Sequence, residues 1–113
     1  MNITAESYGH AVILNLKGEL TEDALGAFKQ SVGHQLGGKD VVDLVLNCQD
    51  VTFIDSAGLE YLLDLQDQLA ERLGQVRLAK CSQDVRKILE VTRLEPAFDL
   101  FEEIPEAIKA TEL

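Results

Sequence analysis

An aspartate and a serine occupy an abrupt junction in the stretch VTFIDSAGLEYLL, residues 51–63. The run VTFI is typical of an extended segment, whereas the residues after Ser56 follow a helical spacing. A serine hydroxyl at such a junction could accept a phosphoryl group, act as an acyl-transfer nucleophile, or cap the helix. Asp55 and Ser56 are both favourable N-cap residues, so the residue types alone leave the capping interpretation open.

Gly58 lies inside the first turn of the predicted helix, where glycine costs about 1 kcal/mol relative to alanine. It therefore needs a reason, which is either the close approach of another backbone or room for a bulky group beside Ser56. The unpaired N–H groups of a helix N-terminus favour an anion. A phosphate on Ser56 should therefore be tolerated without unfolding of the helix.

Other kinds of catalytic or binding site lack their partners in this sequence. No G-x-S-x-G motif surrounds Ser56 and no histidine is evidently placed to activate it. His10 and His34 have no second metal ligand at a suitable spacing, and no P-loop lysine follows a glycine-rich run. We therefore predict no metal site, no bound cofactor and no enzymatic activity.

A response-regulator receiver is the nearest alternative among small α/β folds. Asp55 would then be the phosphoacceptor and Lys80 the accompanying lysine. A receiver also needs adjacent acids directly after its first buried strand, to hold Mg²⁺. The corresponding stretch has separated acids instead, namely Glu19, Glu22 and Asp23. This departure argues against a receiver.

The elements that must position Ser56 follow from hydrophobic periodicity. We predict a hairpin of strands 3–7 and 11–17, and a helix that Thr21 or Asp23 caps and Gly37-Gly38 ends. Strands are then expected at 40–47, 75–80 and 97–101. They alternate with helices at 56–73, where Gly74 is the C′ residue, at 81–94, which Ser82 caps, and at 102–109.

This alternation predicts the fold class. Strands joined by helices pair in parallel through right-handed crossovers, and the opening hairpin adds one antiparallel edge strand. The 113 residues suffice for one domain, which we expect to span residues 1–113. The prediction is a small α/β domain with a mixed, mostly parallel sheet.

Charge and composition restrict the partners. The net charge is -10, from 20 acidic and 10 basic residues, and only 5% of the residues are aromatic. Such a chain is poorly suited to nucleic acid or to an anionic membrane surface. It has no signal peptide and no apolar run of the roughly 20 residues that span a bilayer, so we expect a cytoplasmic protein. Cys48 and Cys81 are then expected to be free thiols, although each follows a predicted strand and the two could approach each other.

The sequence resembles a known family in the segment LVLNCQDVTFIDSAGLEYLLDL. This segment is similar to the signature of the STAS domain, especially in anti-sigma factor antagonists. The segments LKGELTEDALGAF and VRLAKCSQDVRKILEVTRLEPAFDLFEEIPEAI resemble the first crossover and the C-terminal part of the same fold. The resemblance covers nearly the whole chain.

The resemblance implies a partner-switching function. In that family the motif serine is phosphorylated by a partner anti-sigma factor, which is itself a serine kinase, and a serine/threonine phosphatase restores the unmodified form. The unmodified antagonist captures the kinase and frees the sigma factor. By match, Ser56 would be phosphorylated and Asp55 would help to position it. ATP and Mg²⁺ would belong to the kinase. The implied partner-binding surface comprises Thr21, Asn47, Asp55, Ser56, Ala57, Gly58 and Glu60.

Four positions depart from the family pattern. The family often has aspartate where this chain has Thr21 and Asn47, a small residue in place of Glu60, and glycine in place of Arg93. Glu60 lies one turn from Ser56, where it would repel a phosphate if the two side chains converge. The alternative function is therefore a non-phosphorylated STAS adaptor or scaffold in a regulatory or transport complex, with Ser56 serving only as a cap.

Overall fold

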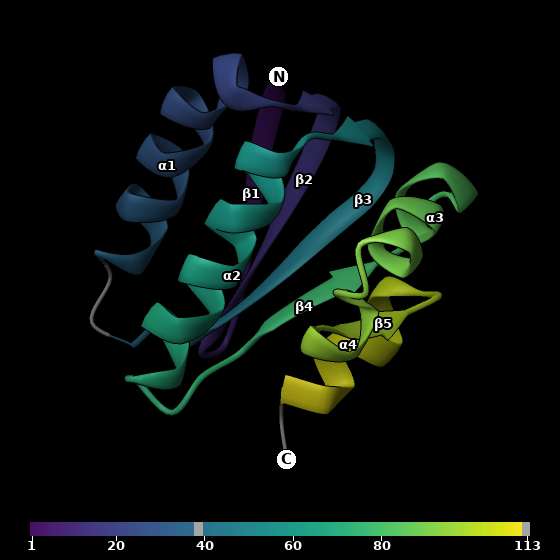
Figure 1. Ribbon diagram of the computed structural model, residues 1–113. Helices are drawn as coiled ribbons and strands as arrows, with labels where there is room; N and C mark the ends of the chain where they lie inside the picture. The colour runs from purple at the N-terminus through teal and green to yellow at the C-terminus, as the bar shows by residue number, and fades with distance from the viewer. Residues whose placement is uncertain (38–39, 112–113) are drawn as a thin grey trace.

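In the computed structural model, which describes residues 1–37 and 40–111, helices pack on both faces of one five-stranded sheet (Figure 1). The strands are β1 (Asn2–Tyr8), β2 (Ala11–Leu20), β3 (Asp43–Ile54), β4 (Val76–Ala79) and β5 (Asp99–Phe101). The helices are α1 (Glu22–Leu36), α2 (Ser56–Ala70), α3 (Gln83–Val91) and α4 (Ile104–Thr111), with a 3₁₀ turn at Glu95–Ala97.

The strand order in the sheet is the order in the chain, β1-β2-β3-β4-β5. β1 pairs antiparallel with β2 through a turn in which Gly9 has φ +58°, and every later pair is parallel. The predicted fold class, a mixed and mostly parallel sheet with an N-terminal hairpin, is confirmed.

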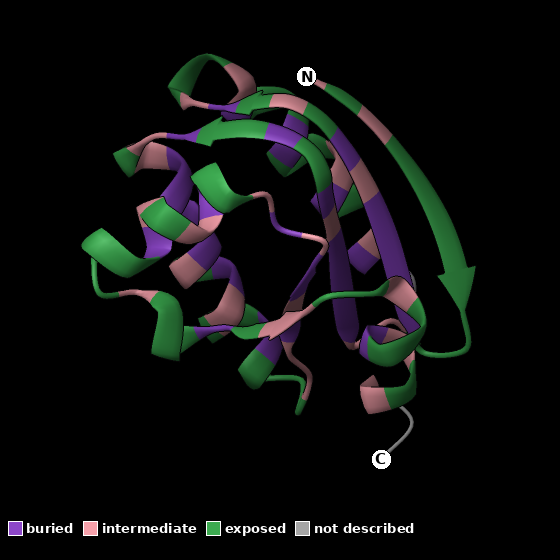
Figure 2. Cartoon of the chain, turned by 90° about the vertical axis from the view of Figure 1, so that its right-hand side faces the viewer, coloured by how far each residue is buried: buried purple, intermediate pink, exposed green. Residues whose placement is uncertain are grey.

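The hydrophobic core is divided by the sheet. The larger part joins α1, α2 and α3 to one sheet face and contains fully buried side chains such as Phe28, Leu62 and Leu89. A smaller cluster on the other face consists of Ile13, Val45, Ala79 and, from α4, Ala107. Figure 2 shows the buried middle strands between these layers, with the edge strand β1 largely exposed. Among the described residues, no helix has both the length and the apolar character to cross a membrane.

The strand β3 is longer than predicted. We expected it to end at Asn47, because polar residues interrupt the apolar run after that point. The structure continues the ladder with β2 to the pair Leu20–Ile54, across register shifts beside Lys17 and Gly18. Gly18 permits one of these shifts, because it adopts φ +120°. The junction before Ser56 lies at the end of this ladder, directly after the pair Leu20–Ile54.

The end of α2 also differs from the prediction. The helix ends at Ala70, and Leu73, which was expected in the apolar stripe, is 95% exposed. Leu73 has φ +63°, and the N–H groups of Leu73 and Gly74 donate to the carbonyls of Ala70 and Leu69. Leu73 is therefore the C′ residue of a Schellman motif, and Gly74 follows it. Gly74 is required for another reason, since a Cβ there would overlap the carbonyl of Val42.

Candidate functional site: the Ser56 corner

The strands β2 and β3 end side by side at what we call the Ser56 corner, formed by Thr21, Asp55, Ser56, Ala57 and Gly58. The last ladder pair is Leu20–Ile54, and the N–H of Asp55 donates to the carbonyl of Leu20 at 3.2 Å. The helices α1 and α2 begin directly after this pair, with Thr21 and Asp55 as their N-cap residues. Because both strands end together, the N-termini of two helices meet at this corner.

The carboxylate of Asp55 joins the two helices. Its Oδ1 accepts a hydrogen bond from the N–H of Gly58 in α2 at 2.8 Å, and its Oδ2 accepts one from the N–H of Glu22 in α1 at 2.9 Å. Thr21, by contrast, makes no side-chain capping bond. The bonds from Gly58 and Glu22, in that order of effect, hold the pKa of Asp55 below its ordinary value. The ionised carboxylate of Asp55 therefore links the N-termini of the two helices.

Gly58 is explained by a close approach of the backbone. It is buried, and a Cβ at this position would overlap the carbonyl oxygen of Leu20 and lie 3.0 Å from Cγ2 of Ile54. Of the two reasons that the sequence left open, the structure supports the first. Gly58 faces the interior, and it allows α2 to lie against the end of β2.

Ser56 is the first residue of α2 and is exposed. The cap of this helix is Asp55, so the interpretation of Ser56 as the cap residue is wrong. Within the part of the chain that the structure describes, no hydrogen bond to the Ser56 hydroxyl is found. The hydroxyl therefore faces solvent at a helix N-terminus.

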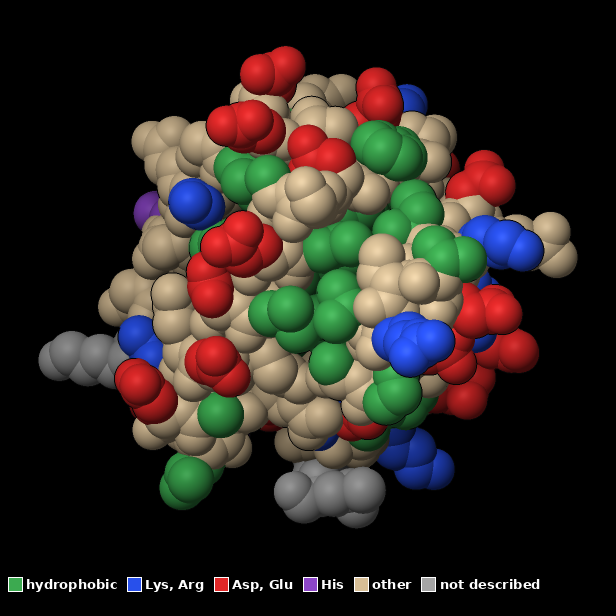
Figure 3. All heavy atoms as spheres, in the orientation of Figure 1, with side chains coloured by type: hydrophobic (Ala, Val, Ile, Leu, Met, Phe, Trp, Pro, Cys, Tyr) green, Lys and Arg blue, Asp and Glu red, His purple; other side chains and the backbone are tan. Residues whose placement is uncertain are grey.

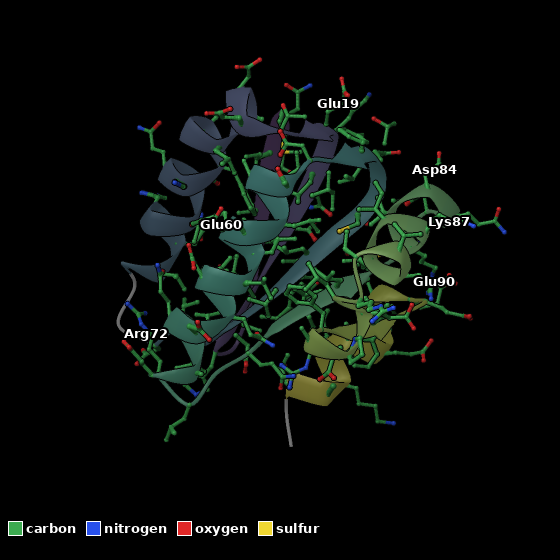
Figure 4. The ribbon with its side chains drawn as sticks, viewed as in Figure 1. Glu19, Glu60, Arg72, Asp84, Lys87 and Glu90 are labelled. Carbon is green, nitrogen blue, oxygen red and sulfur yellow. The ribbon has the colours of Figure 1, made fainter. Side chains whose placement is uncertain are left out.

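The predicted partner-binding residues separate into two groups. Thr21, Ala57 and Gly58 lie at the corner with Asp55 and Ser56, and Glu60 follows one turn along α2, where it is exposed (Figure 4).

Asn47 lies apart from them, in the middle of β3. Its amide donates to Oδ1 of Asn15 at 2.8 Å, and the Asn15 amide donates to Oγ1 of Thr4 at 3.3 Å. It alternates along β3 with Leu46 and Cys48, which face the larger core. Asn47 therefore belongs to a polar row on the sheet face that α4 partly covers.

Sequence reasoning missed an apolar strip beside the corner. Ser56, Leu63 and Asp67 are spaced to share one outward face of α2. Leu63 and Ile88 of α3 are only half-buried, while Phe53 and Val91 are 43% and 66% exposed. We call Phe53, Leu63, Ile88 and Val91 the apolar strip, and Figure 3 shows hydrophobic side chains gathered over α2 and α3. A sequence signal was available for Val91, which falls outside the apolar helical spacing of Val85, Ile88 and Leu89.

Acidic side chains border this strip. On α2 the exposed residues Glu60 and Asp67 lie on the outward face. On α3 Figure 4 shows Asp84, Lys87 and Glu90 projecting outward along the helix. An apolar centre with a mostly acidic border is suited to binding a protein surface of opposite charge.

A cavity of about 540 Å³ between α1 and α2 is lined by two cationic side chains, those of Lys29 and Arg72. Both of them contact other groups of the protein. Arg72 donates to the carbonyls of Leu36 and Val41, and Lys29 lies over the ring of Tyr61. Among the described residues no group of histidine, cysteine and acidic side chains could hold a metal ion.

The STAS domain family model matches residues 2–107. The chain belongs to the STAS domain family. A STAS-domain-containing protein of Pseudomonas aeruginosa is 38% identical over 56 residues, which cover 50% of this chain and 55% of that protein. The match thus spans about half the length of this curated relative.

Solved structures show the same fold. A candidate anti-sigma factor antagonist from Thermotoga maritima is 22% identical, with TM-score 0.89, and the match covers 98% of this chain and 95% of that one. The anti-sigma factor antagonist SpoIIAA in its unphosphorylated form is 23% identical, with TM-score 0.84, and the match covers 98% and 96% of the two chains. The predicted resemblance to the STAS fold of anti-sigma factor antagonists is confirmed.

Proposed function

We propose that this STAS protein is an anti-sigma factor antagonist whose binding to a partner anti-sigma factor, a serine kinase, is switched off by phosphorylation of Ser56. The observation that carries the proposal is the exposed Ser56 hydroxyl at the start of α2, where Asp55 already supplies the cap. The serine is not needed to begin the helix, so it can be modified.

The corner can accept a phosphate without refolding. A phosphoserine adds about -1.5 to -2 charges, and a helix N-terminus is the favourable place for them. The hydrogen bonds that link α1 to α2 are accepted by the Asp55 carboxylate and do not involve the Ser56 hydroxyl. SpoIIAA itself has been solved in both an unphosphorylated and a phosphorylated form, so that fold exists in both states.

The switch would act at the interface. Ser56 shares the outward face of α2 with Leu63 and follows Phe53 closely, so a partner that covers the apolar strip also covers Ser56. A dianion buried there without a cation opposite it costs several kcal/mol of desolvation. Phosphorylation would therefore release the partner, and a serine/threonine phosphatase would restore binding. In this scheme the protein is a binding module and a substrate; ATP and Mg²⁺ belong to the kinase.

The first experiment is peptide mapping of the protein purified from its native cells, across residues 50–72. We expect a phosphate on Ser56 in a fraction that depends on growth conditions. The second is capture of the co-purifying partner with three variants. Ser56→Ala should bind like wild type, whereas Ser56→Asp should bind at least about tenfold more weakly.

Ser7→Asp is the matched control, because Ser7 is an exposed serine on the edge strand β1, far along the chain from the corner. It adds the same charge and should leave capture unchanged. If Ser56 is never phosphorylated and Ser56→Asp binds as tightly as wild type, the protein is instead an adaptor, and the switch is excluded.

A further inference from the structure

The two cysteines lie together behind α3. Cys48 follows Asn47 in β3, and Cys81 lies two residues beyond Ala79, the partner of Asn47 in the neighbouring strand β4. Both are buried, with 3% and 9% of their surface exposed, and both are free thiols. Both side chains belong to the larger buried cluster. The fold thus brings two free thiols into one part of the core, an approach that the sequence left open.

The two thiols have different surroundings. Cys81 lines an open cleft of about 510 Å³, and the other lining residues are Gln49, Lys80, Gln83, Arg86 and Glu102. Cys81 directly precedes Ser82, the N-cap of α3, and Nε of Arg86 donates to its carbonyl at 3.4 Å. Cys48 is enclosed in the larger core, where its Sγ lies 3.6 Å from the carbonyl oxygen of Leu46. A small molecule in the cleft can reach Cys81 first.

The same surroundings favour a thiolate on Cys81. The neighbouring Cys48 thiol and the positive charge of Arg86 lower the pKa of the Cys81 thiol, in spite of its burial. The neighbouring Cys81 thiol and burial raise the pKa of Cys48. A thiolate at a helix N-terminus beside a cation is the reactive form of cysteine.

We propose that Cys81 is a peroxide-reactive thiol and that Cys48 is its resolving partner, so that a hydroperoxide entering the cleft converts the pair into an intrachain disulfide. The Cys81 thiolate attacks the peroxide, its O–O bond breaks, and the leaving oxygen departs as water or an alcohol after taking a proton. Cys81 becomes a sulfenic acid. The Cys48 thiol then attacks the sulfenic sulfur, its S–O bond breaks, and water leaves as the S–S bond forms. One peroxide thereby removes two electrons from two thiols.

The geometry permits the second step. Neighbouring strands lie about 4.8 Å apart. Cys81 follows the end of β4 by two residues, and the Ser82 hydroxyl donates to the carbonyl of Val51 at 3.4 Å, which holds this segment against β3. The Cα atoms of Cys48 and Cys81 can therefore come within the separations that disulfides bridge. The bond would fasten β3 to the start of α3, the helix that carries Ile88 and Val91 of the apolar strip. Oxidation would thus act on a different element from Ser56, and it does not depend on the proposed phosphorylation.

The test uses the reduced full chain treated with one equivalent of hydrogen peroxide. We expect a mass loss of about 2 Da, corresponding to the two thiol hydrogens, and a cross-linked peptide that joins Cys48 to Cys81. Oxidation should be at least about tenfold faster than that of glutathione under the same conditions. The two single variants are matched controls for each other. Cys48→Ala should accumulate a sulfenic acid on Cys81 that dimedone traps, whereas Cys81→Ala should leave Cys48 unreacted.

Oxidation no faster than that of glutathione, or disulfides formed only between chains, would overturn the proposal. If either variant fails to fold, brief dimedone trapping during oxidation of the wild-type chain decides the order of reaction. An adduct on Cys81 supports the assignment, and an adduct mainly on Cys48 contradicts it.

Discussion

At the scale of single residues, the Ser56 corner is organised by Asp55 and Gly58. Asp55 ties α1 to α2 through two backbone N–H groups, and Gly58 lets the first turn of α2 rest on the carbonyl of Leu20. Ser56 takes part in neither contact, which leaves it available for modification.

Gly58→Ala should lower the free energy of unfolding by about 1–3 kcal/mol, because the added methyl group overlaps the end of β2 and forces the helix outward. Gly26→Ala is the control in an exposed part of α1, where a Cβ meets nothing within 4 Å. There the higher helix propensity of alanine should raise stability by about 1 kcal/mol. Urea unfolding of both variants measures the difference, and equal effects would show that the close approach at Gly58 is unimportant.

The stability that Asp55 contributes should depend on pH. Its pKa in the folded chain is depressed by the bonds from Gly58 and Glu22, so the folded state favours the ionised carboxylate. This contribution is present above the unfolded-state pKa and is lost as the pH falls through the folded-state pKa. Asp55→Asn should therefore unfold at less urea than wild type at neutral pH, and the gap should narrow in acid.

Asp67→Asn, at an exposed position further along α2, is the control and should match wild type at neutral pH. A gap for Asp55→Asn that stays constant from neutral pH into acid would contradict the role of the carboxylate.

The sequence predicted the type of this corner better than its details. The junction, the pair of capping residue types and the need to explain Gly58 were all visible in the residues. The role of Asp55 at the start of α1 could not be predicted, because its bond from the N–H of Glu22 joins two helices and depends on tertiary structure. Asn47 was expected near Ser56 because the strand seemed to end there, yet the ladder with β2 carries β3 seven residues further.

At the scale of elements, two helices are followed by non-glycine residues in the left-handed backbone conformation, which is sterically unfavourable for them. Leu73 after α2 and Arg93 after α3 both have positive φ, near +60°, and both are exposed. The N–H of Leu94 donates to the carbonyl of Leu89, which makes the end of α3 a Schellman motif like that of α2. Glycine is the usual residue at this position, and Arg93 is where related sequences were expected to carry it.

Leu73→Gly and Arg93→Gly should each raise the free energy of unfolding by about 1 kcal/mol, because glycine adopts positive φ without the steric cost of a Cβ. Lys87→Gly is the control, since Lys87 is an exposed residue within α3 where glycine should cost about 1 kcal/mol. Thermal unfolding distinguishes the opposite signs. A loss of stability in Leu73→Gly would show that its exposed side chain stabilises the folded state.

The end of α2 was mispredicted for a physical reason. Gly74 seemed the natural C′ residue because glycine commonly ends helices. In the structure it is glycine because the carbonyl of Val42 passes too close for a side chain. A sequence shows that glycine is needed but not which of these two constraints demands it. The elements themselves and their order were predicted correctly from periodicity.

At the scale of the whole molecule, charge should govern how partners arrive. The chain carries a net charge of -10, and acidic side chains border the apolar strip. If a partner with a basic border binds there, its association rate should fall as salt is added, because screening shortens the range of attraction. The dissociation rate, set mainly by the apolar centre, should change less.

Stopped-flow measurements at several ionic strengths would separate the two rates. Lys87→Glu makes the border of the strip more acidic. It should therefore speed association with a basic partner at low salt. An association rate that is indifferent to salt would contradict electrostatic steering.

The agreement between strand order and chain order has a consequence for synthesis on the ribosome. Each strand that emerges finds its neighbour already in place, so the sheet can be extended one βα unit at a time without waiting for a distant segment. The exception is α4, which follows all five strands and packs over Ile13, Val45 and Ala79 on the second sheet face. A nascent chain should therefore expose this apolar surface, and depend on chaperones, until α4 has left the exit tunnel.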